Sequence, residues 1–107
     1  MSDLPPPVAR YFDAQKARDV EAQTLCFTED ALVHDEGQDH QGLDAIRKWK
    51  LAVQSKFEYE CEPLAASVEG ATVSVLVRLT GNFPGSPVDL DHQFTLDGDK
   101  ISGLSIS

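Results

Sequence analysis

Apolar and polar positions follow two different periods along this chain, and the change of period divides it into two halves. From Val8 the apolar residues recur every three or four positions, which predicts a first helix behind the prolines at 5–7. Asp19 is typical of an N-cap and predicts a short second helix over 20–27. A third helix is predicted over 43–56, where the inward stripe is formed by Leu43, Ile46, Trp49, Lys50 and Val53.

The remaining segments have the period of two that is typical of strands. A short strand is predicted over 31–36, with a turn at Gly37 and a return strand over 39–41. From Phe57 onward alternation predicts four longer strands, separated by turns at 69–70 and 97–99 and by the loop 81–87. Pro63 indicates an edge or a bulge, and Gly103 a bulge. Three helices followed by a curved antiparallel sheet predict an α+β fold, and residues 1–107 form a single domain.

Charge and composition exclude several classes of partner. The chain of 107 residues carries 18 acidic and 9 basic side chains, a formal net charge of −9, which disfavours nucleic acid and anionic membrane surfaces. No apolar run is long enough to cross a bilayer, and residues 1–7 lack the pattern of a signal peptide, so a cytoplasmic location is expected. In that setting Cys26 and Cys61 are expected to be reduced, and their spacing fits no zinc or redox motif.

Asp35 is the first candidate for chemistry. Alternation places Ala31, Val33 and Asp35 on the buried face of their strand and Leu32, His34 and Glu36 on the other. A carboxylate at the rim of an apolar pocket becomes a stronger base. On pattern alone, a solvated aspartate in the following turn is the favoured interpretation.

Two short segments resemble a known superfamily. Arg10-Tyr11-Phe12 in the first helix, followed by the strand Asp30-Ala31-Leu32-Val33-His34-Asp35, is similar in order and spacing to the NTF2-like superfamily of cone-shaped α+β proteins, which includes SnoaL-like polyketide cyclases and ketosteroid isomerases. The resemblance implies that Asp35 is a catalytic base. It also implies that the Tyr11 hydroxyl donates a hydrogen bond to an enolate oxygen. Without the resemblance, Tyr11 reads as a core aromatic residue.

A third site residue is expected on the strand over 88–96. Alternation puts His92 on the inward face with Leu90 and Phe94. If the chain is instead aligned with the ketosteroid isomerases without gaps, starting from the turn, the matching residue is Asp91. Alternation favours His92, which can donate a hydrogen bond and titrate near neutral pH. A buried histidine bonded to a backbone carbonyl is the alternative.

Two further groups complete the candidate site. His34 and His40 would face each other if Gly37 were the centre of its hairpin, which would suit a divalent metal, but short polar hairpins collect such residues without function, and no metal is expected. The walls of an apolar pocket are assigned to aromatic and aliphatic side chains, namely Phe12, Phe27, Val33, Trp49, Phe57 and Phe94.

These residues support three functions. The first is an enzyme without cofactor that removes a proton next to a carbonyl group, as an isomerase, cyclase or dehydratase acting on a small hydrophobic compound. The second is a pocket that binds such a compound without catalysis, and the third is a dimeric interaction domain with a vestigial pocket. A homodimer is expected from the resemblance and the small size of the domain, with Leu76 on the paired face.

Overall fold

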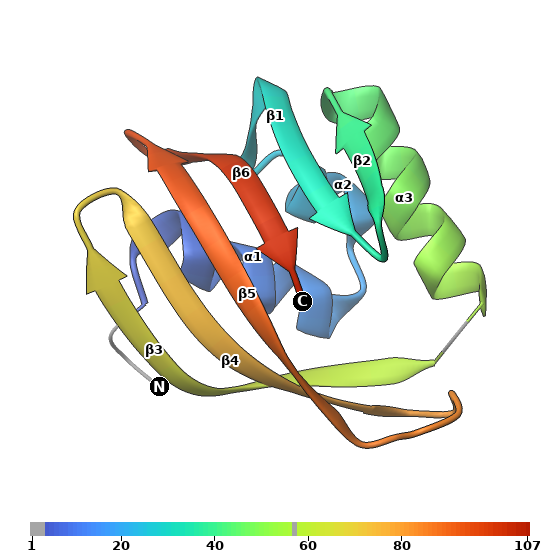
Figure 1. Ribbon diagram of the computed structural model, residues 1–107. Helices are drawn as coiled ribbons and strands as arrows, with labels where there is room; N and C mark the ends of the chain where they lie inside the picture. Colours follow the sequence, from blue (N-terminus) through green and yellow to red (C-terminus); the bar gives the residue numbers. More distant parts are fainter. Residues whose placement is uncertain (1–3, 57) are drawn as a thin grey trace.

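The computed structural model describes residues 4–56 and 58–107, which form three helices and one six-stranded sheet (Figure 1). The helices are α1 (Pro6–Ala17), α2 (Val20–Thr24) and α3 (Leu43–Lys56). The strands are β1 (Phe27–Asp35), β2 (Gln38–Gln41), β3 (Tyr59–Glu69), β4 (Thr72–Gly81), β5 (Val88–Asp97) and β6 (Lys100–Ile106). The predicted α+β class is confirmed, and α3 has the predicted bounds.

The sheet is mixed, whereas the sequence predicted an antiparallel one. Its strand order is β2-β1-β6-β5-β4-β3, and β6 lies between β5 and β1 (Figure 1). β6 forms an antiparallel hairpin with β5 on one side and pairs in parallel with β1 on the other, where Val33 lies opposite Leu104. The sheet curves around α1, and α3 packs beside β1 and β2.

Helix α1 begins at Pro6, two residues before the predicted Val8, and α2 begins where the sequence predicts but is shorter. Asp19 is confirmed as the N-cap, since its side chain accepts a hydrogen bond from the Ala22 backbone N–H at 3.1 Å. Helix α2 ends at Thr24, and Phe27 belongs to β1 instead. The Ile101 backbone N–H donates to the Cys26 carbonyl at 2.8 Å, so a partner far along the chain draws this segment into the sheet. None of the described helices has the length and apolarity required to cross a membrane.

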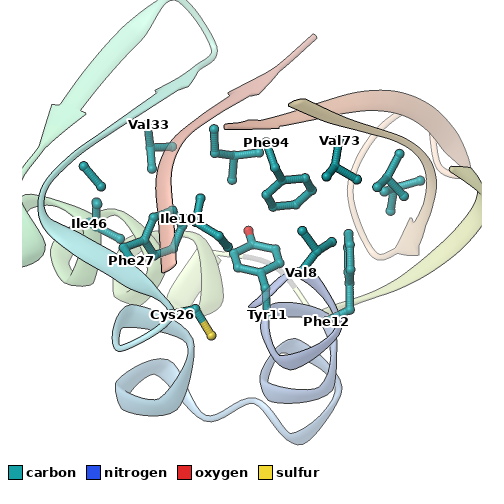
Figure 2. Packing of buried hydrophobic residues seen from close by; sticks show 14 of the residues in the cluster. Val8, Tyr11, Phe12, Cys26, Phe27, Val33, Ile46, Val73, Phe94 and Ile101 are labelled. Atoms are coloured by element: carbon teal, nitrogen blue, oxygen red, sulfur yellow. The ribbon is translucent and has the colours of Figure 1, made fainter. Parts of the chain in front are cut away.

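The core lies between α1 and the concave face of the sheet (Figure 2). Tyr11 stands at its centre, with its ring edge-on to the rings of Phe12, Phe27 and Phe94 at centroid distances of 5.3–5.8 Å. Figure 2 shows its hydroxyl oxygen directed away from α1 and toward the strands. The predicted inward positions of β1 are confirmed, because Ala31 and Val33 are fully buried.

The hairpin between β1 and β2 has a tighter turn than the sequence suggested. Glu36 and Gly37 both have positive φ angles, 53° and 75°, which is typical of a two-residue primed turn. Asp35 therefore pairs with Gln38, and His34 faces Asp39 rather than His40. The predicted pairing of the two histidines is wrong by one residue.

Two irregularities shape the curved strands. β3 is an edge strand of the sheet, and its register shifts between Pro63 and Ala65, as the proline predicted. In β6, Ser102 has no partner in the register with β5, so the bulge lies one residue before the predicted Gly103.

Candidate active site

A cavity of about 730 Å³ opens between α3 and the strands β3, β4 and β5. This volume suits a small organic ligand. Much of the wall is apolar, contributed by Val53, Leu79, Phe83, Pro84, Val88, Leu90 and Ile106. The polar residues of the wall include all three predicted site residues, Tyr11, Asp35 and His92. The fold therefore brings together side chains from α1, β1 and β5 that the sequence could only propose separately.

Asp35 ends β1 at the edge of this cavity. Its Oδ2 atom accepts a hydrogen bond from the indole Nε1–H of Trp49 at 3.0 Å, and its side chain is half-buried. Trp49 itself is buried and belongs to α3, so the helix fixes the orientation of the carboxylate. Asp35 also lines the cavity, so its carboxylate can face a ligand.

Tyr11 contributes a hydroxyl that is buried and has no hydrogen-bond partner among the described residues. Burial raises its pKa well above the ordinary value, and the nearby Tyr59, Cys61 and Asp35 add to this effect. The phenol therefore stays protonated at neutral pH and remains a hydrogen-bond donor. A buried donor without an acceptor is costly, so this position is one that a ligand oxygen would satisfy.

His92 points inward and Asp91 outward, as the alternation predicted. His92 is 3% exposed, and its Nδ1 atom has no hydrogen-bond partner among the described residues. Burial and the positive charge of Lys50 lower the pKa of His92 to about 4. The imidazole is therefore neutral at pH 7, which corrects the expectation that it titrates near neutrality. A neutral ring still has one N–H to donate.

Lys50 also belongs to the site, although the sequence pattern did not single it out. Its side chain is 4% exposed and lines the cavity, with Nζ donating a hydrogen bond to Gln15 Oε1 at 2.9 Å. The same Nζ lies 4.5 Å from the ring centroid of Trp49 and 5.2 Å from that of Tyr11. The signal was present in the sequence, because Lys50 falls on the inward stripe of its helix.

The surroundings of Lys50 make its ammonium group more acidic. Burial lowers its pKa to about 8, although Cys61 and Asp35 act in the opposite direction. Gln15 is buried as well and also accepts from Gln23 Nε2 at 2.8 Å, so the ammonium is tied into a network of neutral amides. The cavity thus holds a cation at neutral pH that loses its proton more easily than an exposed lysine.

Tyr59 and Cys61 complete the polar part of the wall from β3. Burial raises the pKa of Tyr59 to about 12 and that of Cys61 to about 11. Both groups are neutral at pH 7, so Cys61 is a poor nucleophile. Cys26 lies apart from the cavity, and both cysteines are free, as expected.

The predicted pocket lining divides into two groups. Trp49 lines the cavity, whereas Phe12, Phe27, Val33 and Phe94 pack in the core and are not part of the cavity wall. Phe57 lies outside the described residues. The aromatic side chains on the inner stripes were correctly recognised as buried, but alternation cannot tell a core position from a wall position on the same face of a strand.

The two hairpin histidines lie on opposite faces of β1 and β2. His34 is exposed and its Nδ1 lies 2.6 Å from Asp39 Oδ1, whereas His40 lines the cavity and stacks on Trp49 at 5.7 Å. The register therefore contradicts a shared metal site. Within residues 4–56 and 58–107, no group of three histidine, cysteine or acidic side chains is placed to hold a metal ion.

The arrangement has the parts needed for proton transfer at carbon. The carboxylate of Asp35 is fixed in orientation by an indole, while two neutral donors, Tyr11 and His92, and the buried cation Lys50 belong to the same wall. A carboxylate removes protons, and donors of this kind stabilise the negative charge that develops on a carbonyl oxygen.

This curved sheet with its three helices is the fold of NTF2-like proteins, a class of α+β proteins. The model of the SnoaL-like domain matches residues 8–103, so the chain belongs to the SnoaL-like domain family. No protein with a curated function matches the chain.

Solved structures agree with this assignment. Protein SMa1630 of Sinorhizobium meliloti, a candidate polyketide cyclase, is 42% identical, with a TM-score of 0.96 over 98% of this chain and 96% of the other. SalBIII, described as an epoxide hydrolase/cyclase-like enzyme in pyran ring formation in salinomycin, is 25% identical, with a TM-score of 0.81 over 94% and 85%. A protein of Catenulispora acidiphila with a ketosteroid isomerase-like fold is 19% identical and shares the fold, with a TM-score of 0.85 over 96% and 85%.

Proposed function

We propose that this protein is a cofactor-independent enzyme that removes a proton from the carbon next to a carbonyl group of a small hydrophobic compound. The observation that carries the proposal is that Asp35, Tyr11 and His92 belong to the wall of one cavity, with the Tyr11 hydroxyl and His92 Nδ1 both lacking partners among the described residues. Unpartnered buried groups beside a carboxylate are what a carbonyl substrate would complete.

In the proposed reaction Asp35 takes the proton and the C–H electron pair moves onto the carbonyl oxygen as an enolate. Tyr11 and His92 donate hydrogen bonds to that oxygen. Trp49 holds the carboxylate through the 3.0 Å hydrogen bond and so sets the direction of attack. Return of the proton to another carbon gives isomerisation. Attack of the enolate carbon on a second carbonyl gives cyclisation, and the new alkoxide then takes the proton from Asp35. Loss of a neighbouring hydroxyl, which leaves as water with the proton from Asp35, gives dehydration.

The relatives support this reaction class. The name of the S. meliloti protein and the description of SalBIII both refer to cyclases, and the first is 42% identical to this chain. A binding protein without catalysis is the second candidate, because the same cavity and donors would retain a carbonyl compound. An interaction domain with a vestigial pocket is less well supported, since the cavity is not filled by the side chains around it.

The catalytic role is tested by hydrogen–deuterium exchange at carbon. 2-Tetralone, a flat ketone with acidic C–H groups, is incubated in D₂O with the wild type and with Asp35→Asn, and exchange is followed by NMR. The enzyme proposal expects exchange with the wild type that falls at least about 100-fold in the variant. Binding of 2-tetralone to both proteins without any exchange would support the binding protein instead.

The role of Tyr11 is tested by thermal shift with 2-naphthol, a flat phenol that mimics an enolate. Stabilisation of the wild type should be lost in Tyr11→Phe. Tyr59→Phe is a matched control, because Tyr59 is the other tyrosine of the chain and also lines the cavity. Equal stabilisation of the wild type and of Tyr11→Phe would remove Tyr11 from the mechanism.

We also propose the homodimer and the cytoplasmic location expected from the sequence. The outward face of the sheet supports pairing, because Leu32 is 41% exposed there and Leu76 is half-buried. Light scattering after size-exclusion chromatography tests the dimer, with Leu32→Lys expected to give a monomer.

A further inference from the structure

Lys50 is a buried cation without a carboxylate partner. Only 4% of its side chain is exposed, and among the described residues no carboxylate oxygen lies within salt-bridge distance of its Nζ. Buried charges in proteins are normally paired, because leaving water is costly for an ion. A buried ammonium group without a counter-ion is therefore unusual, and a bound anion would pair with it.

The hydrogen-bonding capacity of this ammonium is also incomplete. A lysine ammonium has three donors, and the hydrogen bond to Gln15 Oε1 at 2.9 Å uses one of them. The faces of Trp49 and Tyr11 provide favourable cation–π contacts, but they supply no acceptor atom. The remaining donors belong to a side chain on the cavity wall, where a ligand can reach them.

The groups that face Lys50 leave it as a local positive charge. On its own helix, Trp49 is uncharged, and on β3 and β5 burial keeps Cys61 and His92 neutral at pH 7. Tyr11 on α1 is neutral as well. Asp35 on β1 is the carboxylate within electrostatic reach, and its Oδ2 is occupied by the Trp49 indole rather than by Lys50.

We propose that the substrate carries an oxyanion, a carboxylate or an ionised enol, and that Lys50 binds it inside the cavity. This inference rests on the proposed function and narrows it to acidic carbonyl compounds. The anion completes the hydrogen bonds of the ammonium and neutralises a buried charge. The formal net charge of −9 repels anions from the surface in general, and Lys50 is the buried cation of the cavity wall, whereas Lys56, which also lines it, is exposed.

The test compares matched acid and amide ligands by isothermal titration calorimetry at pH 7. 2-Naphthoate and 2-naphthamide have nearly the same shape, and only the first is an anion. The wild type should bind 2-naphthoate about 10- to 100-fold more tightly. Lys50→Met should abolish that preference. Lys48→Met, which removes an equal charge from an exposed position of the same helix outside the cavity wall, should keep it.

A second pair of ligands separates the two sources of an oxyanion. 4-Nitrophenol, which is ionised at pH 8, is compared with the neutral 4-nitroanisole as a mimic of an ionised enol. If Lys50 is required for tighter binding of 2-naphthoate than of its amide, the substrate is assigned as a carboxylate. If Lys50 is required for tighter binding of 4-nitrophenolate than of 4-nitroanisole, the substrate is assigned as an ionised enol. Equal affinity for anion and neutral analogue in both pairs, or a preference that persists in Lys50→Met, would overturn the inference.

The wild type alone gives an independent readout if Lys50→Met does not fold. The affinity for 2-naphthoate should be constant from pH 6 to 7.5 and fall about tenfold per pH unit above pH 8, because the ligand stays anionic while Lys50 loses its proton. Cys61 and Tyr59 titrate only near 11 and 12, so they do not contribute in this range. An affinity that is flat up to pH 9.5 contradicts the role of Lys50. Because binding does not require proton removal by Asp35, loss of exchange with 2-tetralone would leave this result standing.

Discussion

The buried histidine makes the stability of the fold depend on pH in a defined direction. The pKa of His92 falls from an ordinary 6.5 to about 4 in the folded protein, mainly through burial and also through the charge of Lys50. Between these two values the unfolded chain binds one more proton than the folded protein does. The free energy of unfolding is therefore complete above pH 6.5 and decreases as the pH falls toward 4.

The size of this effect follows from the same two pKa values. At about 1.4 kcal/mol per pH unit, the interval from 6.5 to about 4 corresponds to a loss of about 3 kcal/mol. For a domain with a stability of roughly 5–15 kcal/mol, this is a substantial fraction. His92→Gln cannot titrate, so its free energy of unfolding should lack this component while keeping every contribution from the carboxylates.

Urea unfolding at a series of pH values from 4 to 7.5 measures the difference. The fluorescence of Trp49, the single tryptophan of the chain, reports unfolding. The wild-type and His92→Gln values should diverge by about 3 kcal/mol over this range. Parallel curves for the wild type and His92→Gln would refute the argument, whatever their offset at pH 7.

Three further substitutions test the packing around the cavity. Tyr11→Phe removes a buried hydroxyl without a partner and should raise the free energy of urea unfolding by about 1–2 kcal/mol; a loss of stability would imply a hidden partner. Lys50→Met should raise the free energy of unfolding by about 1–3 kcal/mol at pH 7, because it removes a buried charge while Gln15 Oε1 keeps its hydrogen bond from Gln23. This gain should become smaller from pH 7 to 9, because wild-type Lys50 loses its proton in that range. Gly81→Ala should cost about 2–3 kcal/mol, because the new methyl carbon would collide with the Glu58 carbonyl oxygen; a thermal melt identical to the wild type would contradict that crowding.

The sequence predicted those parts of the fold that depend on local periodicity. The bounds of α3 and the inward positions of β1 and β5 follow from spacing alone, and so does the choice of His92 over Asp91. The parallel pairing of β1 with β6 and the early end of α2 depend on contacts between residues far apart in the chain. Local patterns contain no information on such pairings.

Part of the candidate site was also predictable from short segments of the sequence. Asp35 and Tyr11 were found through a resemblance of short segments, and both lie on the cavity wall. The helical spacing places Lys50 on the inward stripe of its helix, but spacing alone does not show that the stripe borders a cavity at this point. His34 and His40 show the limit of hairpin reasoning, because a turn one residue tighter moves a side chain to the opposite partner.

The position of β6 has a consequence for how the sheet assembles. Without β6 the sheet would divide into two ribbons, β1 with β2 and β3 with β4 and β5, and each would have an open edge where β6 now lies. β6 thus joins the two ribbons and makes the sheet continuous. Its pairing with β1 joins segments that are far apart in the chain, and contacts of this kind form slowly in folding. The two open edges also define a slot that a separately supplied β6 peptide would fill.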